Sequence, residues 1–168
     1  MLKRKTPLTI KNALSRAAAL CARCEQCSPD ILKKLSVWGL SASDAEKVIA
    51  KLEDMNFLDD MRFAKAYAHD KLHFSGWGRR KIQQGLWAKR LPRVVIEHSC
   101  DELDDDSDSY RIIAEKVIKA KARQFKEQPL SRESKIKLVK FAMTRGFEYQ
   151  LIVEIMRRGV ATQSDEIE

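Results

Sequence analysis

Hydrophobic residues recur along the first third of the chain with the spacing of amphipathic helices. From 9 to 24 they fall at i, i+3, i+4 and i+7, which predicts one helix. A second helix is predicted from Ser28 as its N-cap to Gly39 as its C-cap. Ser43 followed by Glu46 has the spacing of a capping box and predicts the start of a third. The apolar positions of these helices are Ile10, Ala13, Leu14, Ala17, Ala18, Cys21, Ile31, Leu32, Leu35, Trp38, Val48, Ile49 and Leu52.

The same three-helix pattern occurs three times in the sequence. We take Gly39, Arg90 and Gly146 as equivalent positions, at spacings of 51 and 56 residues. The residues four and eight positions before them, and six and ten after them, are then all apolar or small. Internal repetition of this period is typical of stacked helical units. We therefore predict an all-α fold, a tandem array of three three-helix repeats forming an elongated, curved helical protein.

The repeat alignment also predicts the boundaries of the units. The predicted segments are an N-terminal tail at 1–8, repeats at 9–56, 57–103 and 110–158, an acidic linker at 104–109, and a C-terminal tail at 159–168. The linker lies in the run DELDDDSD at 101–108, which holds six acids and no base.

Charge is distributed unevenly over the 168 residues. The net charge is +8, and because of the acidic run the remaining residues together carry +14. A basic field of this size favours binding to a polyanion or to an acidic protein surface. The sequence has no apolar run long enough to cross a membrane and no signal-peptide pattern. We therefore expect a soluble, cytoplasmic protein with no membrane partner.

Three cysteines at 21–27, in the sequence CARCEQC, have the spacing of an iron–sulfur motif. A helix turns by about 100° per residue, so Cys21 falls in the middle of the predicted core and Cys24 at its edge. Cys27 falls further round, and three thiols spread in this way cannot converge on one ion. Cys100 occupies a core position of the second repeat. Buried cysteine behaves as a small hydrophobic residue, so we predict core thiols, no metal site and no cofactor.

Other patterns associated with catalysis or metal binding are weak. His69 and His73 lie at i, i+4, a spacing that can bind zinc, but a third ligand has no signature and a solvated helix face is the better interpretation. The acids of 104–115 outline a calcium loop, yet Ser109 stands where such a loop needs glycine, so a linker is predicted. The sequence contains no glycine-rich phosphate loop or nucleophile motif. We expect neither an enzyme nor a small-molecule substrate.

A basic segment with an aromatic residue, FSGWGRRKI at 74–82, is the strongest candidate for a binding surface. Trp77 lies between two glycines and is followed by bases that could hold phosphates while the ring stacks on a nucleobase. Alternatively, Trp77 packs on the core and the bases form an ordinary solvated face; the sequence does not decide between the two. The candidate residues for partner or nucleic-acid binding are Trp77, Arg79, Arg80, Lys81, Lys89, Arg90 and Arg93.

The middle repeat resembles the RecX family of recombination regulators. The resemblance is carried by NFLDDMRFAKAYAHDKL at 56–72 and GWGRRKIQQGLWAKRL at 76–91. Arg90 departs from the family pattern, which usually has glycine there, and so does Gly85, where an acid often precedes the leucine. The residues that match the central signature are Leu58, Asp59, Asp60, Arg62, Phe63, Ala64 and Tyr67.

Most residues of this signature are of types expected to stabilise the fold. Asp59 and Asp60 are expected to cap the helix that they begin and to favour its dipole. Phe63 and Tyr67, at i and i+4, are expected to form its core stripe, while Arg62 points away from that stripe. Function is therefore expected on the basic faces.

The resemblance implies a non-enzymatic regulator in DNA repair and the SOS response. Such a protein binds the RecA recombinase filament and mainly inhibits its recombination, ATPase and coprotease activities. Single- or double-stranded DNA is a further partner that the basic surface allows. The alternative is a sequence-specific, helix-turn-helix-like DNA-binding protein, in which Gln83 and Gln84 with Arg79 and Arg80 read base edges. The other two repeats offer no matching set, so the regulator is preferred.

Overall fold

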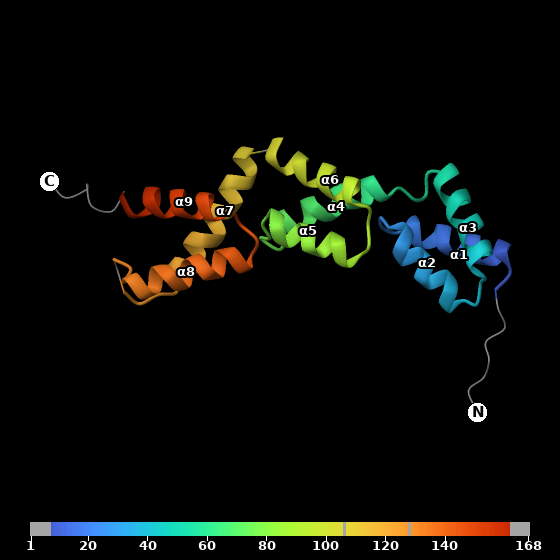
Figure 1. Ribbon diagram of the computed structural model, residues 1–168, viewed down its shortest axis with the longest axis horizontal. Helices are drawn as coiled ribbons and strands as arrows, with labels where there is room; N and C mark the ends of the chain where they lie inside the picture. The colour runs from blue at the N-terminus through green and yellow to red at the C-terminus, as the bar shows by residue number, and fades with distance from the viewer. Residues whose placement is uncertain (1–7, 106, 128, 162–168) are drawn as a thin grey trace, which may run out of the picture. The chain divides into compact units, whose positions relative to one another are not determined.

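A computed structural model of the protein describes residues 8–105, 107–127 and 129–161. In these ranges the secondary structure is α-helical, with no strand, which confirms the predicted all-α fold (Figure 1). The helices are α1 (Ile10–Cys21), α2 (Ser28–Val37), α3 (Ala42–Asp54), α4 (Asp60–His73), α5 (Arg79–Ala88), α6 (Arg93–Asp105), α7 (Ser107–Ala122), α8 (Arg132–Thr144) and α9 (Tyr149–Ala161).

The helices belong to two compact units. The first contains α1, α2, α3, the start of α4 through Ala66, and the segment Leu86–Ile96. The second contains Tyr67–Gly85 and the described residues from Glu97 onward.

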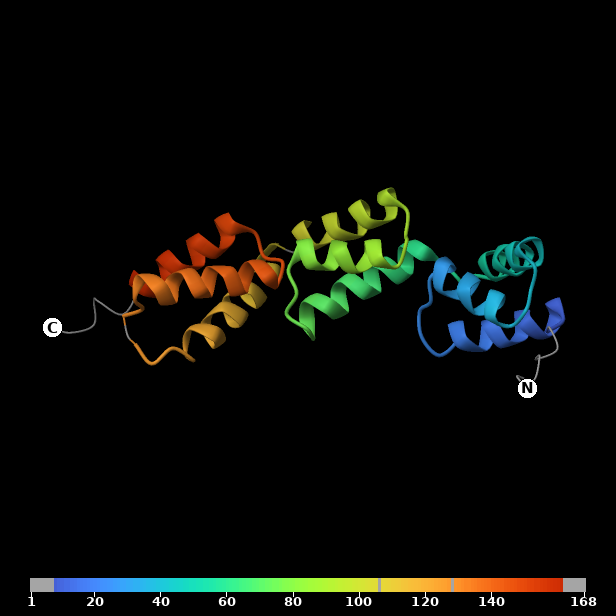
Figure 2. The same cartoon turned by 60° about the horizontal axis from the view of Figure 1, so that its bottom comes forward.

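In the first unit, α1 and α2 both pack against α3 (Figure 2). The apolar stripes that predicted these helices meet in one cluster, and burial of such side chains is the main favourable contribution to folding. The buried members of the cluster are Ala13, Ala17, Ile31, Leu35, Ala45, Val48, Ile49, Leu52 and Leu58.

In the second unit, α7, α8 and α9 contact one another in all three pairs (Figure 2). Of the four positions that the repeat alignment assigned to the third repeat, Leu138, Ala142 and Ile152 are buried and Met156 is only half-buried. The other buried apolar residues of these helices and the turn between α8 and α9 are Ala114, Ile118, Phe147 and Ile155.

The three residues that the repeat alignment makes equivalent, Gly39, Arg90 and Gly146, share one backbone conformation. Their φ angles are 89°, 62° and 93°, and at each position the backbone N–H donates to the carbonyl three residues earlier. This left-handed conformation ends the second helix of each repeat, and glycine adopts it with little strain. Arg90 adopts it with a Cβ atom, at the position where the other two repeats have glycine.

Two of the predicted helix caps are wrong. The N-cap of α2 is Cys27, not Ser28, because the helix begins one residue earlier than predicted. The N-cap of α3 is Ser41, not Ser43, and its hydroxyl accepts the N–H of Asp44 at 3.1 Å. Ser41 and Ser43 are each followed by an acidic residue three positions later, so the local sequence alone did not identify the N-cap of α3.

Part of the segment predicted as an acidic linker is helical. Residues 104 and 105 end α6, and 107–109 begin α7; residue 106 lies outside the described residues. Asp108 lies in the first turn of α7, where a carboxylate favours the helix dipole. Residues 107–115 form a regular helix rather than the loop conformation that binds calcium.

The thiols are not arranged as the helical rotation predicted. Cys21, expected in the middle of the core, is half-buried; Cys24 is exposed, and Cys27 is fully buried. The reason is that α1 ends at Cys21, so the helical rotation does not continue to Cys27, which instead turns inward as the N-cap of α2. Cys100 is buried, as predicted.

Candidate functional site

The Trp77 ring is held by two lysines of its own unit. Trp77 is partly buried, and the ammonium nitrogens of Lys71 and Lys81 lie 4.9 and 4.6 Å from its ring centroid. At this range a cation is attracted by the π face of the ring. The ring is thus neither fully packed into the core nor an open stacking platform, because a nucleobase would compete with these ammonium groups.

The loop that carries Trp77 is joined to the turn between α8 and α9. The Gly78 N–H donates to the Arg145 carbonyl at 2.7 Å, and the Arg80 N–H donates to the Gly146 carbonyl at 3.1 Å. The Arg145 side chain donates back to the Ser75 carbonyl at 3.0 Å. A Cβ atom at Gly78 would lie 2.4 Å from the carbonyl carbon of Gly146, so only glycine allows the two backbones to approach this closely.

Arg79, a predicted binding residue, is bonded within the same joint. Its Nη2 lies 2.6 Å from Asp101 Oδ1, and its backbone N–H donates to the Tyr110 hydroxyl at 2.9 Å. The Tyr110 hydroxyl donates to Glu148 Oε2 at 2.9 Å. Burial raises the pKa of Tyr110, so the hydroxyl keeps the proton that it donates. Much of the Arg79 side chain is therefore engaged in structure.

Lys89, a second predicted binding residue, is engaged in the first unit. Its Nζ lies 2.6 Å from Asp30 Oδ2 and 5.4 Å from the Phe63 ring centroid. Burial acts to raise the pKa of Asp30, but the hydrogen bond and charge of Lys89 outweigh it, and the net pKa is lowered. Burial also raises the pKa of the neighbouring Cys27 thiol to about 11, which makes this thiol unreactive at neutral pH.

The other predicted contact residues are more accessible. In the second unit Arg80 is exposed and Lys81 is partly exposed; in the first unit Arg90 and Arg93 are exposed. The structure thus separates the seven predicted residues into groups on two units, and it places the charged ends of Arg79 and Lys89 in ion pairs.

The acidic pair of the family signature caps two different helices. Asp59 Oδ1 accepts the Arg62 N–H at 2.9 Å and caps α4, as predicted. Asp60 lies in the first turn of α4, where it favours the helix dipole as predicted, but its Oδ1 accepts the Ser28 N–H at 2.7 Å and so caps α2 rather than α4. The Arg62 side chain points away from the core stripe and pairs with Glu25 at 2.6 Å.

The apolar part of the signature is architectural as well. Leu58, Phe63 and Ala64 are buried, and Tyr67 is partly buried. A Cβ atom at Gly85 would lie 2.3 Å from the Tyr67 hydroxyl oxygen, so glycine at this departure from the family pattern leaves room for the tyrosine.

Two hydrogen bonds, from Ser28 to Asp60 and from Arg79 to Tyr110, each join one repeat to the next, and we call these contacts joints. Ser28 and Arg79 each begin the second helix of a repeat, and they correspond in the repeat alignment. Each donates its backbone N–H to a side-chain oxygen from the first helix of the next repeat, Asp60 in α4 or Tyr110 in α7. Sequence reasoning missed both joints, because the donor and acceptor lie more than thirty residues apart.

Sequence reasoning also missed an exposed apolar pair in the first unit. Trp87 is 52% exposed and Val94 is 73% exposed, although both are large apolar residues. Trp87 directly follows the buried Leu86, so it lies about 100° around α5 from the core. Exposed tryptophan is common at protein interfaces.

The histidine pair lies on a solvated face, as interpreted from sequence. The rings of His69 and His73 are both exposed, with centroids 4.1 Å apart. Over the described parts of the chain, no three or more His, Cys, Asp or Glu side chains are grouped so that they could hold a metal ion. None of the helices in those parts is long and apolar enough to cross a membrane.

The fold and its joints define a helical-repeat protein with a basic surface. A model of the RecX family, described as its second three-helix domain, matches residues 59–99. A protein of Vibrio parahaemolyticus named regulatory protein RecX is 32% identical over 153 residues, which cover 89% of this chain and 92% of that protein. The chain belongs to the RecX family of regulatory proteins.

Further relatives carry the same name, and solved structures share the fold. Regulatory protein RecX of Vibrio campbellii is 31% identical over 81% of this chain, and that of Finegoldia magna is 26% identical. The chain spans 84% of the length of the first and 61% of the second. The crystal structure of RecX from Lactobacillus salivarius has a TM-score of 0.79 at 18% identity, over 89% of this chain and 95% of that one. A crystal structure of regulatory protein RecX has a TM-score of 0.78 at 22% identity, over 88% and 71%.

Proposed function

We propose that the protein binds the filament of the RecA recombinase in the cytoplasm and restrains its recombination, ATPase and coprotease activities. The observation that carries the proposal is membership of the RecX family, established by a relative that is 32% identical over 89% of the chain. The relatives are named as regulatory proteins, and direct contact with the recombinase is the simplest way for such a protein to regulate it.

The repeat architecture supports binding to a polymer. Each joint fixes the second helix of one repeat to the next repeat through backbone hydrogen bonds, at Ser28 in the first unit and at Gly78 and Arg79 in the second. Repeats joined in this way can each offer a surface to a protomer of the filament, so that weak contacts add by multivalency.

We propose that the exposed bases of the middle repeat make part of the contact. Arg80 and Lys81 in the second unit, and Arg90 and Arg93 in the first, are accessible to a partner. Trp77 keeps Lys81 near the loop surface through the cation–π contact. The ion pairs of Arg79 in the second unit and of Lys89 in the first make each of these residues a structural support of its own unit.

Charge reversal with a matched control tests this assignment. We expect Arg80→Glu with Lys81→Glu to weaken inhibition of RecA ATP hydrolysis several-fold, because like charges then face the partner. The control is Lys33→Glu with Lys51→Glu, which makes the same charge change at two exposed lysines of the first repeat. Arg79 is left unchanged, because its replacement would break the ion pair with Asp101. Equal effects of the two double changes, at unchanged helicity, would contradict the assignment.

The alternative function is sequence-specific DNA binding by the three-helix units. A mobility-shift assay on random and selected duplexes separates the two proposals. A strong preference for one duplex sequence would favour the alternative, whereas binding that is uniform over sequence and falls steeply with salt reports phosphate contacts only.

A further inference from the structure

The positive charge of the protein is concentrated in the third repeat. Residues 110–158 contain 13 Lys and Arg and five Asp and Glu, a net charge of +8, which equals that of the whole chain. The middle repeat, 57–103, contains nine bases and six acids, a net charge of +3. The strongest field therefore lies outside the repeat that carries the family signature.

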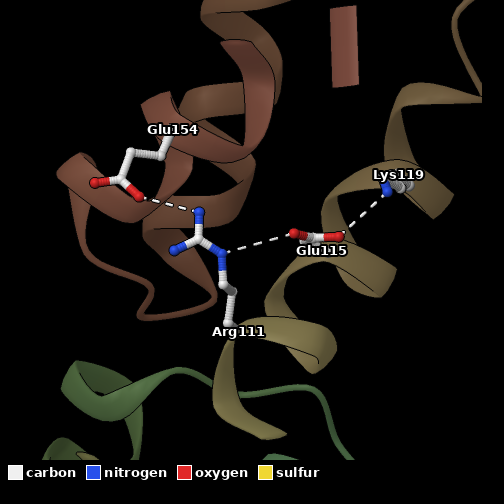
Figure 3. Close-up of polar contacts among 4 residues, drawn as sticks. All are labelled: Arg111, Glu115, Lys119 and Glu154. Carbon is white, nitrogen blue, oxygen red and sulfur yellow. Dashed lines mark hydrogen bonds and ion pairs between the residues drawn. The ribbon is translucent and has the colours of Figure 1, made fainter. Parts of the chain in front are cut away.

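Two acids of the third repeat are bonded to two of its own bases (Figure 3). Arg111 Nη2 lies 3.0 Å from Glu154 Oε2, and Arg111 Nε lies 3.7 Å from Glu115 Oε1. Glu115 also pairs with Lys119 at 3.2 Å. This network ties α7 to α9 and leaves both carboxylates occupied.

Two more acids are engaged in the same way. Glu133 pairs with Lys137 at 2.7 Å, which raises the pKa of Lys137 and lowers that of Glu133. Glu148 accepts the hydrogen bond of Tyr110 at the joint. Four of the five acids are thus committed, and several bases of the repeat are left to attract an external partner.

The outward face of α8 combines such bases with exposed apolar side chains. Arg132, Ile136 and Lys140 follow one another at i+4 spacing and Met143 comes three residues later, so the four lie within an arc of about 80°. Ile136 is 48% exposed, Met143 is 42% exposed, and both bases are exposed. Over the described ranges, neither Arg132 nor Lys140 has an acidic partner within salt-bridge distance. The opposite face, with the buried Leu138, packs into the unit.

We infer that this α8 face (Arg132, Ile136, Lys140 and Met143) docks an acidic, amphipathic segment of a protein partner. Two bases eight residues apart on a helix are separated by about 12 Å along its axis, and they bracket apolar side chains. A helical partner with carboxylates at matching separation, and apolar residues between them, satisfies both features at once. This inference goes beyond the proposed function, because it assigns a second surface and the chemistry of its partner.

The apolar residues favour a protein over a nucleic acid. Phosphates are bound by basic and polar side chains and gain nothing from isoleucine or methionine. Nucleobases stack on aromatic rings, and the α8 face presents none. Methionine adapts its shape to different apolar partners and is enriched at protein interfaces. Charge alone would fit either partner, whereas the combination of charge and apolar area fits a protein.

The test uses a fluorescent synthetic peptide and the full-length protein. The peptide has about 16 residues and places glutamates and leucines on one helical face in the i, i+4 pattern complementary to α8. A peptide of the same composition in scrambled order, and a duplex oligonucleotide, are the competing probes. We expect the patterned peptide to bind at least about fivefold more tightly than the scrambled one, because only its pattern matches both charge and apolar positions.

Two double variants separate the contributions. Ile136→Ser with Met143→Ser is expected to weaken peptide binding about tenfold and to leave duplex binding unchanged. Val37→Ser with Met55→Ser, two apolar residues of the first repeat that are equally exposed or more so, is the matched control and should change neither. Arg132→Glu with Lys140→Glu should abolish the preference for the patterned peptide.

Three results would overturn the inference. One is equal binding of patterned and scrambled peptides. Another is a loss of duplex binding rather than peptide binding in Ile136→Ser with Met143→Ser. The third is the finding that the unchanged protein is a dimer and the variant a monomer, which would assign the face to a second copy of this chain. The recombinase is not used in this test, so the result does not depend on whether the protein regulates RecA.

Discussion

The joint between Gly78 and Gly146 leads to the sharpest prediction, the effect of Gly78→Ala. The added methyl group would lie 2.4 to 2.5 Å from three backbone atoms of Gly146 and Phe147. Real Cβ atoms essentially never make such contacts, and a backbone cannot rotate away as a side-chain tip can. The loop at Gly78 must therefore separate from the turn between α8 and α9.

The expected cost has two parts. Forcing a methyl group into a filled site costs about 1–3 kcal/mol. Separation of the two backbones also weakens the hydrogen bond from the Gly78 N–H to the Arg145 carbonyl, now 2.7 Å, which contributes about 1 kcal/mol. We expect Gly78→Ala to lower the free energy of unfolding by about 2–4 kcal/mol.

Two other glycines of the second unit provide matched controls for the same change. At Gly159, in α9, the nearest atom to an added Cβ is 3.9 Å away, so Gly159→Ala should stabilise the helix by about 0.5 kcal/mol. At Gly85 the added Cβ meets the Tyr67 hydroxyl, the far end of a flexible side chain, so the cost should be intermediate.

Urea denaturation followed by circular dichroism measures the free energies, and amide hydrogen exchange locates the change. In Gly78→Ala, amides of the second unit should lose protection, while those of α1 in the first unit should keep it. A free energy of unfolding for Gly78→Ala within about 0.5 kcal/mol of that for Gly159→Ala would refute the reasoning, because the crowding at Gly78 and the open space at Gly159 predict opposite effects on stability.

Three further predictions concern single contacts. Arg90→Gly should raise the free energy of unfolding in urea by about 0.5 kcal/mol, because relief of the positive φ outweighs the greater flexibility of the unfolded chain; a loss of stability would contradict this. Tyr110→Phe should lower it by about 1–3 kcal/mol, because Glu148 loses a buried donor, and an unchanged urea midpoint would show that the hydroxyl contributes nothing. The pKa of Asp30 is lowered in the folded state, so the stability from its pair with Lys89 is present above about pH 4 and is lost as the pH falls below it. Lys89→Met should therefore flatten the acid dependence of stability between about pH 5 and 3, and an unchanged slope would show that the pair is not responsible.

Periodicity predicted the helices and repeats because it reports burial directly. Equivalent residues such as Ile31, Ile82 and Leu138 occupy the same helix face in each repeat, and all three are buried. The alignment even identified Arg90 as the counterpart of two glycines. Periodicity did not indicate the exposure of Trp87, which directly follows the buried Leu86 and is 52% exposed.

Contacts between repeats could not be predicted, because they join residues far apart in the sequence. Asp60 fits the rule for capping its own helix, but its carboxylate accepts the N–H of Ser28, which lies 32 residues earlier in the sequence. Arg79 and Lys89 look like solvated bases in the sequence, but Asp101 and Asp30 lie within 2.6 Å of them. Candidate binding residues chosen by charge alone therefore include residues that serve structure.

The three repeats share a core and differ in surface charge. The shared positions fill the interior, end the second helix and form the joints, so they limit what each repeat can vary. Net charge is free of these limits, and it increases from +1 in 9–56 through +3 in 57–103 to +8 in 110–158. A partner that only needed a polyanion-binding array would be served by equal charge in each repeat. The gradient, together with the apolar residues of the α8 face, instead argues that the repeats make different contacts, with the third repeat as the site of strongest electrostatic attraction.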